Sequence, residues 1–469
     1  MQTLRSLLWV FVVSALFFSS CGDARQTINF TSQGRIDYQL SADDEALLDS
    51  VQYNTFLFFK EKVNKEKGLF KDRTAYYAPS SIASTGFALP SLAVAVERNW
   101  MTREEAAQIT YNALAFLVES EQSDAVDATG YHGFYYHFLD METGKRTWES
   151  ELSSIDTGLL LMGVIFSRNY YNGDNETERG IREMAAFLLD RLDWSIFEMG
   201  PDTNHPNTIS MGWYPEEGII NWGWYGYNEG LFLYILAAGT GMENVERSFD
   251  AWLETYKWKT PYPGLSHVAF PPLFGHQFSH AFIDFRGIGD KYMKEKGIDY
   301  FENSRRATLT QQQYAIENPH GWKGYGEFIW GVTASDGPGA DYNHSGFEFL
   351  GYAGRGAAGP EYNYFDDGTI APYGAASSLP FAPEIVFPTI RYMLENMGDS
   401  IWGRYGFYDS FNQTAGWVGE DVIGVAQGPM LVLIENFRTG LIWDHVMPDP
   451  IVQKGLNKLG FNYLEKSDK

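Results

Sequence analysis

Residues 211–230 read MGWYPEEGIINWGWYGYNEG, and the apolar run LFLYILAAG follows at residues 231–239. The first part is rich in aromatic rings and glycine, which favours a loop, and the second part has the composition of a buried helix. A lone carboxyl, that of Glu229, stands where the loop meets the helix. The stretch therefore predicts a buried helix that is entered from an aromatic loop carrying an acid.

Helical patterns recur on both sides of this stretch. Ser41 precedes an acidic cluster, and Thr102 with Glu105 forms a capping box, so both positions mark helix starts. Residues 131–148 alternate aromatic and polar side chains around a turn, which predicts a short β-hairpin. We predict helices over residues 41–59, 82–99, 102–117, 153–171, 177–193, 229–241, 246–258, 276–296, 299–316, 383–397 and 427–438.

The order of these helices indicates the fold class. About ten to twelve helices, joined alternately by short and long connections, are what a toroid of paired helices requires. The sequence thus predicts an all-α protein, an (α/α)6 barrel with long aromatic-rich loops and a minor β-hairpin. An α-solenoid or two helical bundles are the competing folds, but we find no repeat of the solenoid type. No linker marks a boundary, so we expect one domain over residues 41–460.

The N-terminus has the pattern of an export signal. Arg5 precedes an apolar run over residues 7–18, which is too short to span a membrane. The lone cysteine, Cys21, ends a Phe-Ser-Ser-Cys box that resembles the processing site of bacterial lipoproteins. We expect residues 1–21 to be a signal peptide, Cys21 to carry a lipid in the periplasm or outer membrane, and residues 22–40 to form a tether. An ordinary signal peptide is the alternative.

Charge and cysteine content limit the partners. The net charge of −25 argues against nucleic acid and against an anionic membrane surface, both of which need a basic footprint. We expect a neutral oligo- or polysaccharide substrate, membrane contact only through the N-terminal lipid, and a monomer. His276 and His280 have the spacing of zinc ligands, but Gln277 stands where a catalytic Glu would be, so we expect no metal and no cofactor.

Aromatic rings around a carboxyl suggest carbohydrate chemistry. Ring faces bind the C–H faces of sugars, and a carboxyl among rings loses solvation, so it keeps its proton and serves as a general acid. Glu229 has this setting, and Asp409 is a second lone acid among aromatic and glycine residues. Glycosidases need two carboxyls, and we take Glu229 and Asp409 as the catalytic pair. Their separation, and with it the choice between inversion and retention, stays open at this point.

Further candidates are predicted to bind substrate. Glu151 and Asp156 stand at a helix start, and their spacing points them to different faces, with one of them toward the mouth. They would hold sugar hydroxyls, or merely complement the helix dipole. Acids at the tips of Gly- and Pro-rich loops would do the same, or form Asx turns. The predicted substrate-binding residues are Asp156, Glu151, Trp222, Trp224, Tyr225, Asp336, Asp367, Tyr373, His276 and Arg286.

Several of these motifs belong together in a known family. The chain resembles the bacterial glucoamylase-like family whose characterised members are β-1,2-glucanases, glycoside hydrolase family 144, over roughly residues 205–445. The matching segments are HQFSHAFIDFRGIGD (276–290), WGVTASDGPG (330–339), DGTIAPYGAASSLPFAPE (367–384), YGFYDSFN (405–412) and QGPMLVLIENFRTGLIW (427–443).

The resemblance implies an (α/α)6 barrel that hydrolyses β-1,2-glucan, either internally or by releasing sophorose, with inversion and without a metal. It implies that Glu229 is the general acid and Asp409 the general base, and that Glu151 and Asp156 lie in the region that supplies further acids to the sugar subsites. Nothing in these residues selects the α-1,4 linkages of starch.

Three alternatives stay open. A glycan-binding surface lipoprotein would use the same rings without needing two lone acids, so the presence of Glu229 and Asp409 favours a hydrolase. A glucosidase acting on another glucan, such as starch, is the second alternative. A polysaccharide lyase would need a basic cleft for uronates, which the net charge of −25 disfavours.

Overall fold

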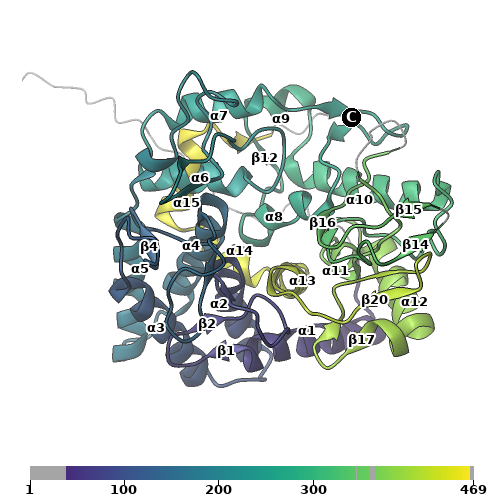
Figure 1. Cartoon of the computed structure of the whole chain (residues 1–469), viewed down its shortest axis with the longest axis horizontal. Helices are drawn as coiled ribbons and strands as arrows, with labels where there is room; N and C mark the ends of the chain where they lie inside the picture. The colour runs from purple at the N-terminus through teal and green to yellow at the C-terminus, as the bar shows by residue number, and fades with distance from the viewer. Residues whose placement is uncertain (1–37, 345, 360–364, 465–469) are drawn as a thin grey trace, which may run out of the picture.

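The structure is a computed structural model that describes residues 38–344, 346–359 and 365–464. The predicted signal peptide, Cys21 and most of the predicted tether lie outside the described residues. The described chain forms an all-α toroid with an inner and an outer layer of helices (Figure 1). The fold class predicted from the sequence is therefore confirmed.

The inner helices form the wall around the axis of the toroid. They are buried along nearly their whole length, and they neighbour one another in chain order around a closed ring. The short α8 and α11 are joined by Gln277, whose Nε2 donates to the carbonyl of Gly374 over 2.7 Å. The inner helices are α2 (Ile82–Glu97), α4 (Ser154–Tyr170), α6 (Leu231–Thr240), α8 (Phe278–Phe282), α11 (Pro372–Ala376) and α13 (Gly424–Arg438).

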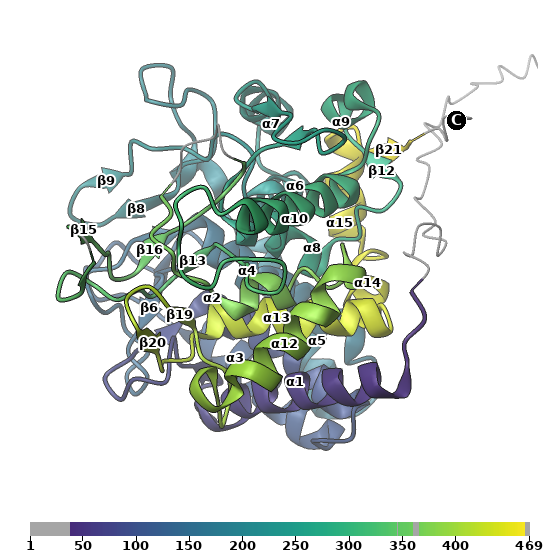
Figure 2. The ribbon, with the colours of Figure 1, turned by 90° about the vertical axis from the view of Figure 1, so that its right-hand side faces the viewer.

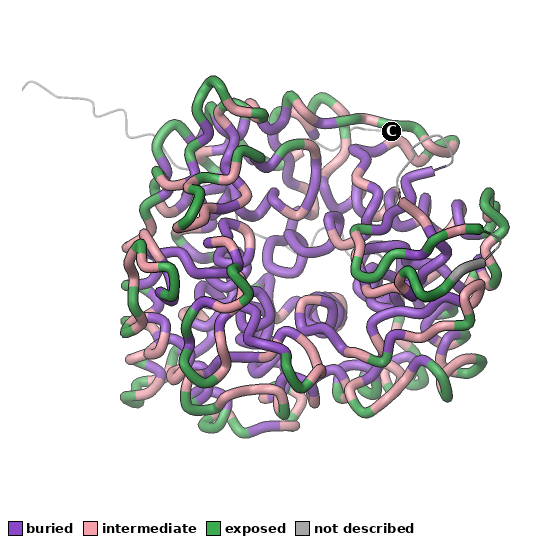
Figure 3. Tube along the Cα trace, in the orientation of Figure 1, coloured by how far each residue is buried: buried purple, intermediate pink, exposed green. Residues whose placement is uncertain are grey.

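The outer helices cover this wall and carry the polar surface. Figure 3 shows buried backbone in the middle and exposed backbone at the rim. α15 packs on α6 near the C-terminus. The outer helices are α1 (Ala42–Glu61), α3 (Arg103–Glu119), α5 (Glu176–Asp190), α7 (Val245–Leu253), α9 (Lys291–Lys296), α10 (Tyr300–Glu317), α12 (Pro383–Ile401), α14 (Leu441–Val446) and α15 (Pro450–Lys458). No helix among the described residues combines the length and apolar character that crossing a bilayer requires.

Two sequence predictions about local structure are wrong. The helix predicted over 276–296 is broken into the 3-10 turn η2 (Leu273–His276), α8 and α9, because Gly287 adopts a positive φ of 76° and Asp290 caps a new helix. The single hairpin predicted over 131–148 is instead a short hairpin over residues 130–135 and a second turn with an antiparallel bridge between Leu139 and Arg146, and the strand between them pairs with residues before α2. α11, α14 and α15 were missed because each is short.

Short strands, rather than one hairpin, shape the loops. Most of them gather at one end of the toroid (Figure 2), whereas β12 and β21 pair at the other end. The strands are β1 (Val63–Asn64), β2 (Leu69–Phe70), β3 (Ser80–Ser81), β4 (Gly130–Tyr131), β5 (Phe134–Tyr135), β6 (Phe138–Leu139), β7 (Leu152–Ser153), β8 (Gly212–Tyr214), β9 (Gly218–Ile219), β10 (Trp258–Lys259), β11 (His267–Val268), β12 (Ile288–Gly289), β13 (Ala334–Ser335), β14 (Asn343–His344), β15 (Phe347–Glu348), β16 (Ala353–Gly354), β17 (Trp402–Gly403), β18 (Gly406–Phe407), β19 (Ser410–Asn412), β20 (Trp417–Gly419) and β21 (Asn462–Tyr463).

The strand-rich end of the toroid is where the inner helices begin. Ser81 and Ser153 cap α2 and α4 there, and Arg73 forms a β-bridge with Ile423 just before α13. Tyr373, at the start of α11, donates from its hydroxyl to the carbonyl of Ala334 in β13. Loops far apart in the sequence therefore meet around one mouth, which we call the toroid mouth.

Candidate active site

Glu229 is presented at the toroid mouth by the backbone that leads into α6. Its carbonyl accepts a hydrogen bond of 2.8 Å from Ser279 Oγ, and Asn228 Oδ1 accepts one of 2.9 Å from the amide of Gly230. These bonds fix the turn at which the aromatic loop becomes a helix. The Glu229 side chain lines a cavity of about 640 Å³, whose wall includes Trp222, Trp224 and Phe270. The cavity has the size of a small-ligand site.

The surroundings of Glu229 favour its protonated form. Its Oε2 is buried and has no hydrogen-bond partner among the described residues. Burial raises the pKa of Glu229 to about 7, and the nearby charge of Asp156 adds to the rise. A carboxyl that still carries its proton near neutral pH can donate it to a leaving group.

Asp409 lies directly before β19 and is almost completely buried, with 1% of its surface exposed. Its Oδ2 accepts a hydrogen bond of 2.7 Å from the backbone amide of Asp336, whereas its Oδ1 is buried without a partner among the described residues. Burial raises the pKa of Asp409 to about 8, with the charge of Asp336 as the second cause. Asp409 thus resembles Glu229 in having one free oxygen and a raised pKa.

The two carboxyls belong to one site. Tyr373, which is 4% exposed, lies at the start of α11. Burial raises the pKa of Tyr373 well above its ordinary value, and among the charges that add to the rise are those of both Asp409 and Glu229. Both carboxyls are therefore within electrostatic reach of one hydroxyl.

An arginine that the sequence analysis missed organises the side of the mouth near Asp409. Arg73 donates to both carboxylate oxygens of Asp336, at 3.2 and 2.9 Å, and to Asp72 at 3.0 Å. Its guanidinium also lies 3.8 Å from Asp421, which accepts a short hydrogen bond from Thr74 Oγ1. The polar run Asp72-Arg73-Thr74 between an apolar strand and a helix start was the available signal.

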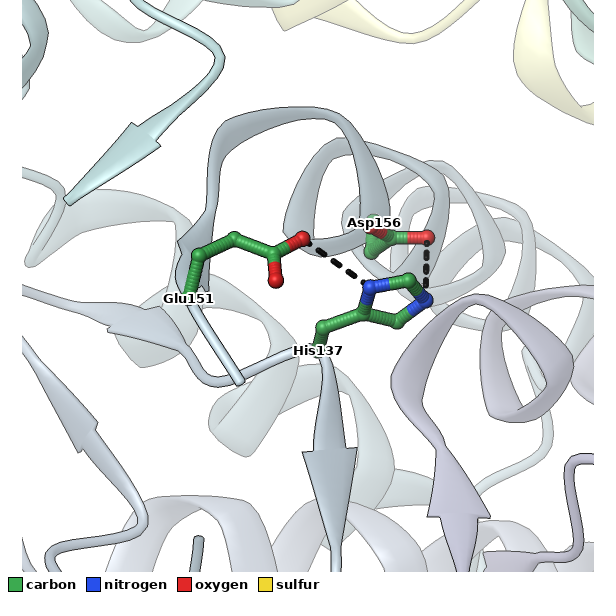
Figure 4. A group of neighbouring side chains, drawn as sticks. All are labelled: His137, Glu151 and Asp156. Carbon is green, nitrogen blue, oxygen red and sulfur yellow. Dashed lines mark hydrogen bonds and ion pairs between the residues drawn. The ribbon is translucent and has the colours of Figure 1, made fainter. Parts of the chain in front are cut away.

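A histidine joins the acids near the start of α4 (Figure 4). His137 Nδ1 lies 2.9 Å from Glu151 Oε1, and its Nε2 lies 3.7 Å from Asp156 Oδ1. The prediction that Glu151 and Asp156 point to different helix faces is wrong, because Glu151 precedes β7 and α4, and both acids flank the same ring. His137 was missed because it lies in the region predicted as a hairpin.

The charge of His137 decides what this cluster can hold. Burial lowers the pKa of His137, but the carboxylates of Asp156 and Glu151 outweigh burial and raise it to about 9. The three side chains place possible metal-ligand atoms within 4.8 Å of one another. An imidazolium has no lone pair to offer a cation, so in its protonated form His137 holds the two acids by charge pairing.

Exposed rings flank the Glu229 side of the mouth. Trp222 and Tyr225 are 42% and 40% exposed, and the ring of His205 stacks on Tyr225 with 3.9 Å between centroids. We call these three residues the tryptophan platform. Trp224 differs from them, because it is only 3% exposed and its Nε1 donates to Ser154 Oγ over 2.9 Å. Trp224 therefore supports the cavity wall from within and offers no exposed ring face to a sugar.

Two predicted sugar ligands are occupied by arginines. Asp367 is fully buried and accepts two hydrogen bonds of 2.8 Å from Arg355, which is also fully buried. A direct contact between Asp367 and a sugar is therefore excluded in this conformation. Asp336 does lie at the mouth, but Arg73 holds both of its carboxylate oxygens.

Two more predicted ligands lie away from the mouth or beneath it. His276 is 1% exposed, and its Nε2 bonds to the carbonyl of Phe270, so its ring serves the core. Arg286 pairs with Asp284 and stacks on Trp443 in a separate cavity of about 160 Å³ near the C-terminal end of α13. Neither residue is placed to contact a substrate at Glu229.

The fold and the site define an all-α toroid with an acid-lined mouth. The chain belongs to the glucoamylase-like family: the family model described as "Putative glucoamylase" matches residues 221–450. A solved putative glucoamylase from Bacteroides uniformis is 32% identical, with a TM-score of 0.78, over 91% of this chain and 99% of that one.

Two relatives carry more specific names. The endo-β-1,2-glucanase of Chitinophaga pinensis, solved with sophorotriose and glucose, is 28% identical, with a TM-score of 0.76, over 90% of this chain and 99% of that one. The exo β-1,2-glucooligosaccharide sophorohydrolase of Parabacteroides distasonis is 29% identical over 450 residues. The match covers 89% of this chain and 58% of that relative, so the chain spans little more than half of its length.

Proposed function

We propose that this protein is a glycoside hydrolase that cleaves β-1,2-glucan by inversion, with Glu229 as general acid and Asp409 as general base. The observation that carries the proposal is the pair of carboxyls at one mouth, each with one buried oxygen that has no partner among the described residues, and the raised pKa of Glu229 suits the acid. The names of the relatives from Chitinophaga pinensis and Parabacteroides distasonis support the linkage.

The environments of the two carboxyls support their separate roles. Glu229 is at the cavity wall, where its proton can reach the leaving glycosidic oxygen. Asp409 is 1% exposed and its Oδ1 is shielded from solvent, so a sugar carbon has poor access to its oxygens. Removal of a proton from water, rather than direct attack on the sugar, suits that position and leads to inversion.

The charge pairs around the mouth hold these groups in place. Arg73 pairs with Asp336 beside Asp409, and His137 pairs with Glu151 and lies close to Asp156 near Glu229. The remaining polar edges of these pairs can accept or donate hydrogen bonds to sugar hydroxyls. Trp222 and Tyr225 add ring faces for stacking on a neutral glucan.

We also propose that the protein is exported, anchored by a lipid at Cys21, and monomeric. Cys21→Ala should move the protein from the membrane fraction to the soluble fraction, and size-exclusion chromatography tests the monomer.

A product profile tests the activity. Residues 22–469 are incubated separately with β-1,2-glucan, soluble starch and laminarin, and the products are resolved by chromatography with the anomeric configuration followed by NMR. We expect products from β-1,2-glucan alone, released as the α-anomer. Products from starch alone would overturn the linkage. Binding to a glucan without any products would favour the capture protein instead.

A further inference from the structure

Two tyrosines stand out on the other side of the toroid mouth. Tyr76 is 92% exposed, the highest value among the large apolar side chains that the structure describes, and Tyr77 is 63% exposed. Their rings meet edge to face, with 5.4 Å between centroids and 87° between planes. We call Tyr76 and Tyr77 the tyrosine pair. Adjacent exposed rings have no stabilising role in the core, so they point to a surface that binds something.

The backbone under the tyrosine pair is held firmly. Lys71 Nζ donates to the carbonyls of Ala75 and Tyr76, at 3.1 and 2.9 Å. The amide of Thr74 donates to the carbonyl of Val422 over 3.1 Å, and the amide of Ala78 closes a turn onto Ala75. Rings on a fixed backbone lose little conformational freedom when a ligand binds, which favours binding.

The same loop carries the charge network of the catalytic pair. Arg73 and Thr74 contact Asp336 and Asp421, and Asp336 in turn donates to Asp409. The tyrosine pair is thus two residues along the chain from groups that touch the site. It is continuous with the mouth and separate from the cavity that Glu229 lines.

The tyrosine pair and the tryptophan platform lie across the mouth from each other. The loop of Tyr76 runs between the starts of α2 and α13, where the amide of Gly424 donates to the carbonyl of Asp72. The tryptophan platform precedes α6, and α6 is three positions from α13 in the ring of inner helices (Figure 1). A chain bound to both aromatic sets would span the toroid mouth, where Glu229 and Asp409 lie.

We propose that the tyrosine pair is an outer sugar-binding platform for β-1,2-glucan, and that the enzyme favours chains long enough to reach both aromatic sets. This inference rests on the proposed function. Tyrosine suits the role because its ring face stacks on the C–H face of a sugar while its hydroxyl bonds to water or to sugar hydroxyls. The occupant is a neutral glucan segment, since the nearby cations Lys71 and Arg73 are already bonded within the protein.

The test compares long and short substrates for the double variant Tyr76→Ala/Tyr77→Ala. We measure kcat/KM on polymeric β-1,2-glucan and on the shortest β-1,2-glucooligosaccharide that the unaltered protein cleaves. The ratio of the two values should fall by about three- to tenfold for each ring removed. Tyr76→Phe/Tyr77→Phe should keep most of the ratio because the ring faces remain.

Tyr53→Ala is the matched control, since Tyr53 is 41% exposed on the outer helix α1. It should leave the ratio unchanged. An unchanged ratio in the double variant, or an equal loss on both substrates, would overturn the inference while the proposed function stands. A protein that dimerises through the tyrosine pair, seen as loss of a dimer in the double variant, would also overturn it. If the unaltered protein cleaves no β-1,2-glucan, the proposed function and this inference fail together.

Discussion

The backbone amide of Asp336 donates to Asp409 Oδ2 over 2.7 Å, while the Asp336 carboxylate is held by Arg73 at 2.9 Å. One residue therefore stabilises the ionised form of Asp409 through its backbone and opposes it through its side-chain charge. Burial and the Asp336 charge prevail, and the pKa of Asp409 rises to about 8. This balance makes Asp336 a residue that sets the pH range of the proposed base.

Replacing Asp336 by Asn should shift the pH profile to lower pH. Turnover requires Glu229 protonated and Asp409 ionised, so kcat/KM should rise toward pH of about 7 and fall above about 8. Without the Asp336 charge the pKa of Asp409 falls, and the descending limb moves toward the pKa of Glu229, about 7. The measurement is kcat/KM on β-1,2-glucan between pH 5 and 9. If kcat/KM falls equally at every pH while the rising and falling limbs stay at the same pH values, Asp336 acts only through positioning.

The stability that Asp409→Asn gains over the unaltered chain should be larger at pH 8 than at pH 5. The folded protein keeps the Asp409 proton up to a pKa of about 8, whereas the unfolded chain releases it at 3.8. Between these values the folded state binds more protons, so this group lowers the free energy of unfolding by about 1.4 kcal/mol per pH unit as the pH rises. Asn does not titrate, so the variant does not lose this free energy of unfolding as the pH rises.

Urea denaturation at four pH values between 5 and 8 measures the effect, with Asp43→Asn on the exposed side of α1 as control. The stability gain of Asp409→Asn should grow with pH, and that of the control should stay constant. A gain that is the same at every pH would mean that Asp409 is ionised in the folded protein throughout this range.

The fold could be predicted because helix periodicity and capping are local signals. The capping residues of α1 and α3, Ser41 and Thr102, lie where the sequence analysis put them. α8 could not be predicted in its true length, because the break after it depends on Gly287 and on the strand pairing of β12 with β21 near the C-terminus. Such pairing joins residues far apart in sequence and leaves no local pattern.

The site was predictable in part for a related reason. A lone acid among rings is visible in sequence, which identified Glu229 and Asp409 as candidates. The ion-pair partners of an acid are not visible in the sequence. Acids that cannot contact a sugar, such as Asp367, differ from the candidates in forming a buried ion pair with an arginine. Arg73 and His137 were missed because their role is to neutralise acids from other loops.

Trp224→Ala and Trp222→Ala should have different effects. Trp224 is 3% exposed and bonded to Ser154, so its truncation should lower the free energy of unfolding by about 3–5 kcal/mol. Trp222 is 42% exposed, so its truncation should leave stability nearly unchanged and weaken glucan binding by about 1 kcal/mol. Thermal unfolding and isothermal titration calorimetry separate the two. Equal losses of stability would show that the exposed ring also supports the fold.

Asp367→Ala should destabilise the fold through Arg355. Both side chains are fully buried, so removing the carboxylate leaves an unpaired buried guanidinium, at a cost of about 3–5 kcal/mol. The double change Asp367→Leu/Arg355→Met should restore much of the loss, because it removes both charges. If Asp367→Ala instead weakened glucan binding at unchanged stability, Asp367 would be a sugar ligand in a conformation other than this one.

Glu229→Gln should abolish hydrolysis while leaving glucan binding largely intact. The amide keeps the shape of the side chain at the cavity wall but has no proton to donate at the pH where the carboxyl, with its pKa of about 7, still holds one. Loss of general acid catalysis lowers rates by about 10²–10⁴-fold. Glu217→Gln is the matched control, since Glu217 is an exposed acid of the same aromatic stretch. Turnover is followed by product release from β-1,2-glucan and binding by calorimetry. Unaltered turnover in Glu229→Gln would remove Glu229 from the acid role, and loss of binding together with turnover would make it a substrate ligand.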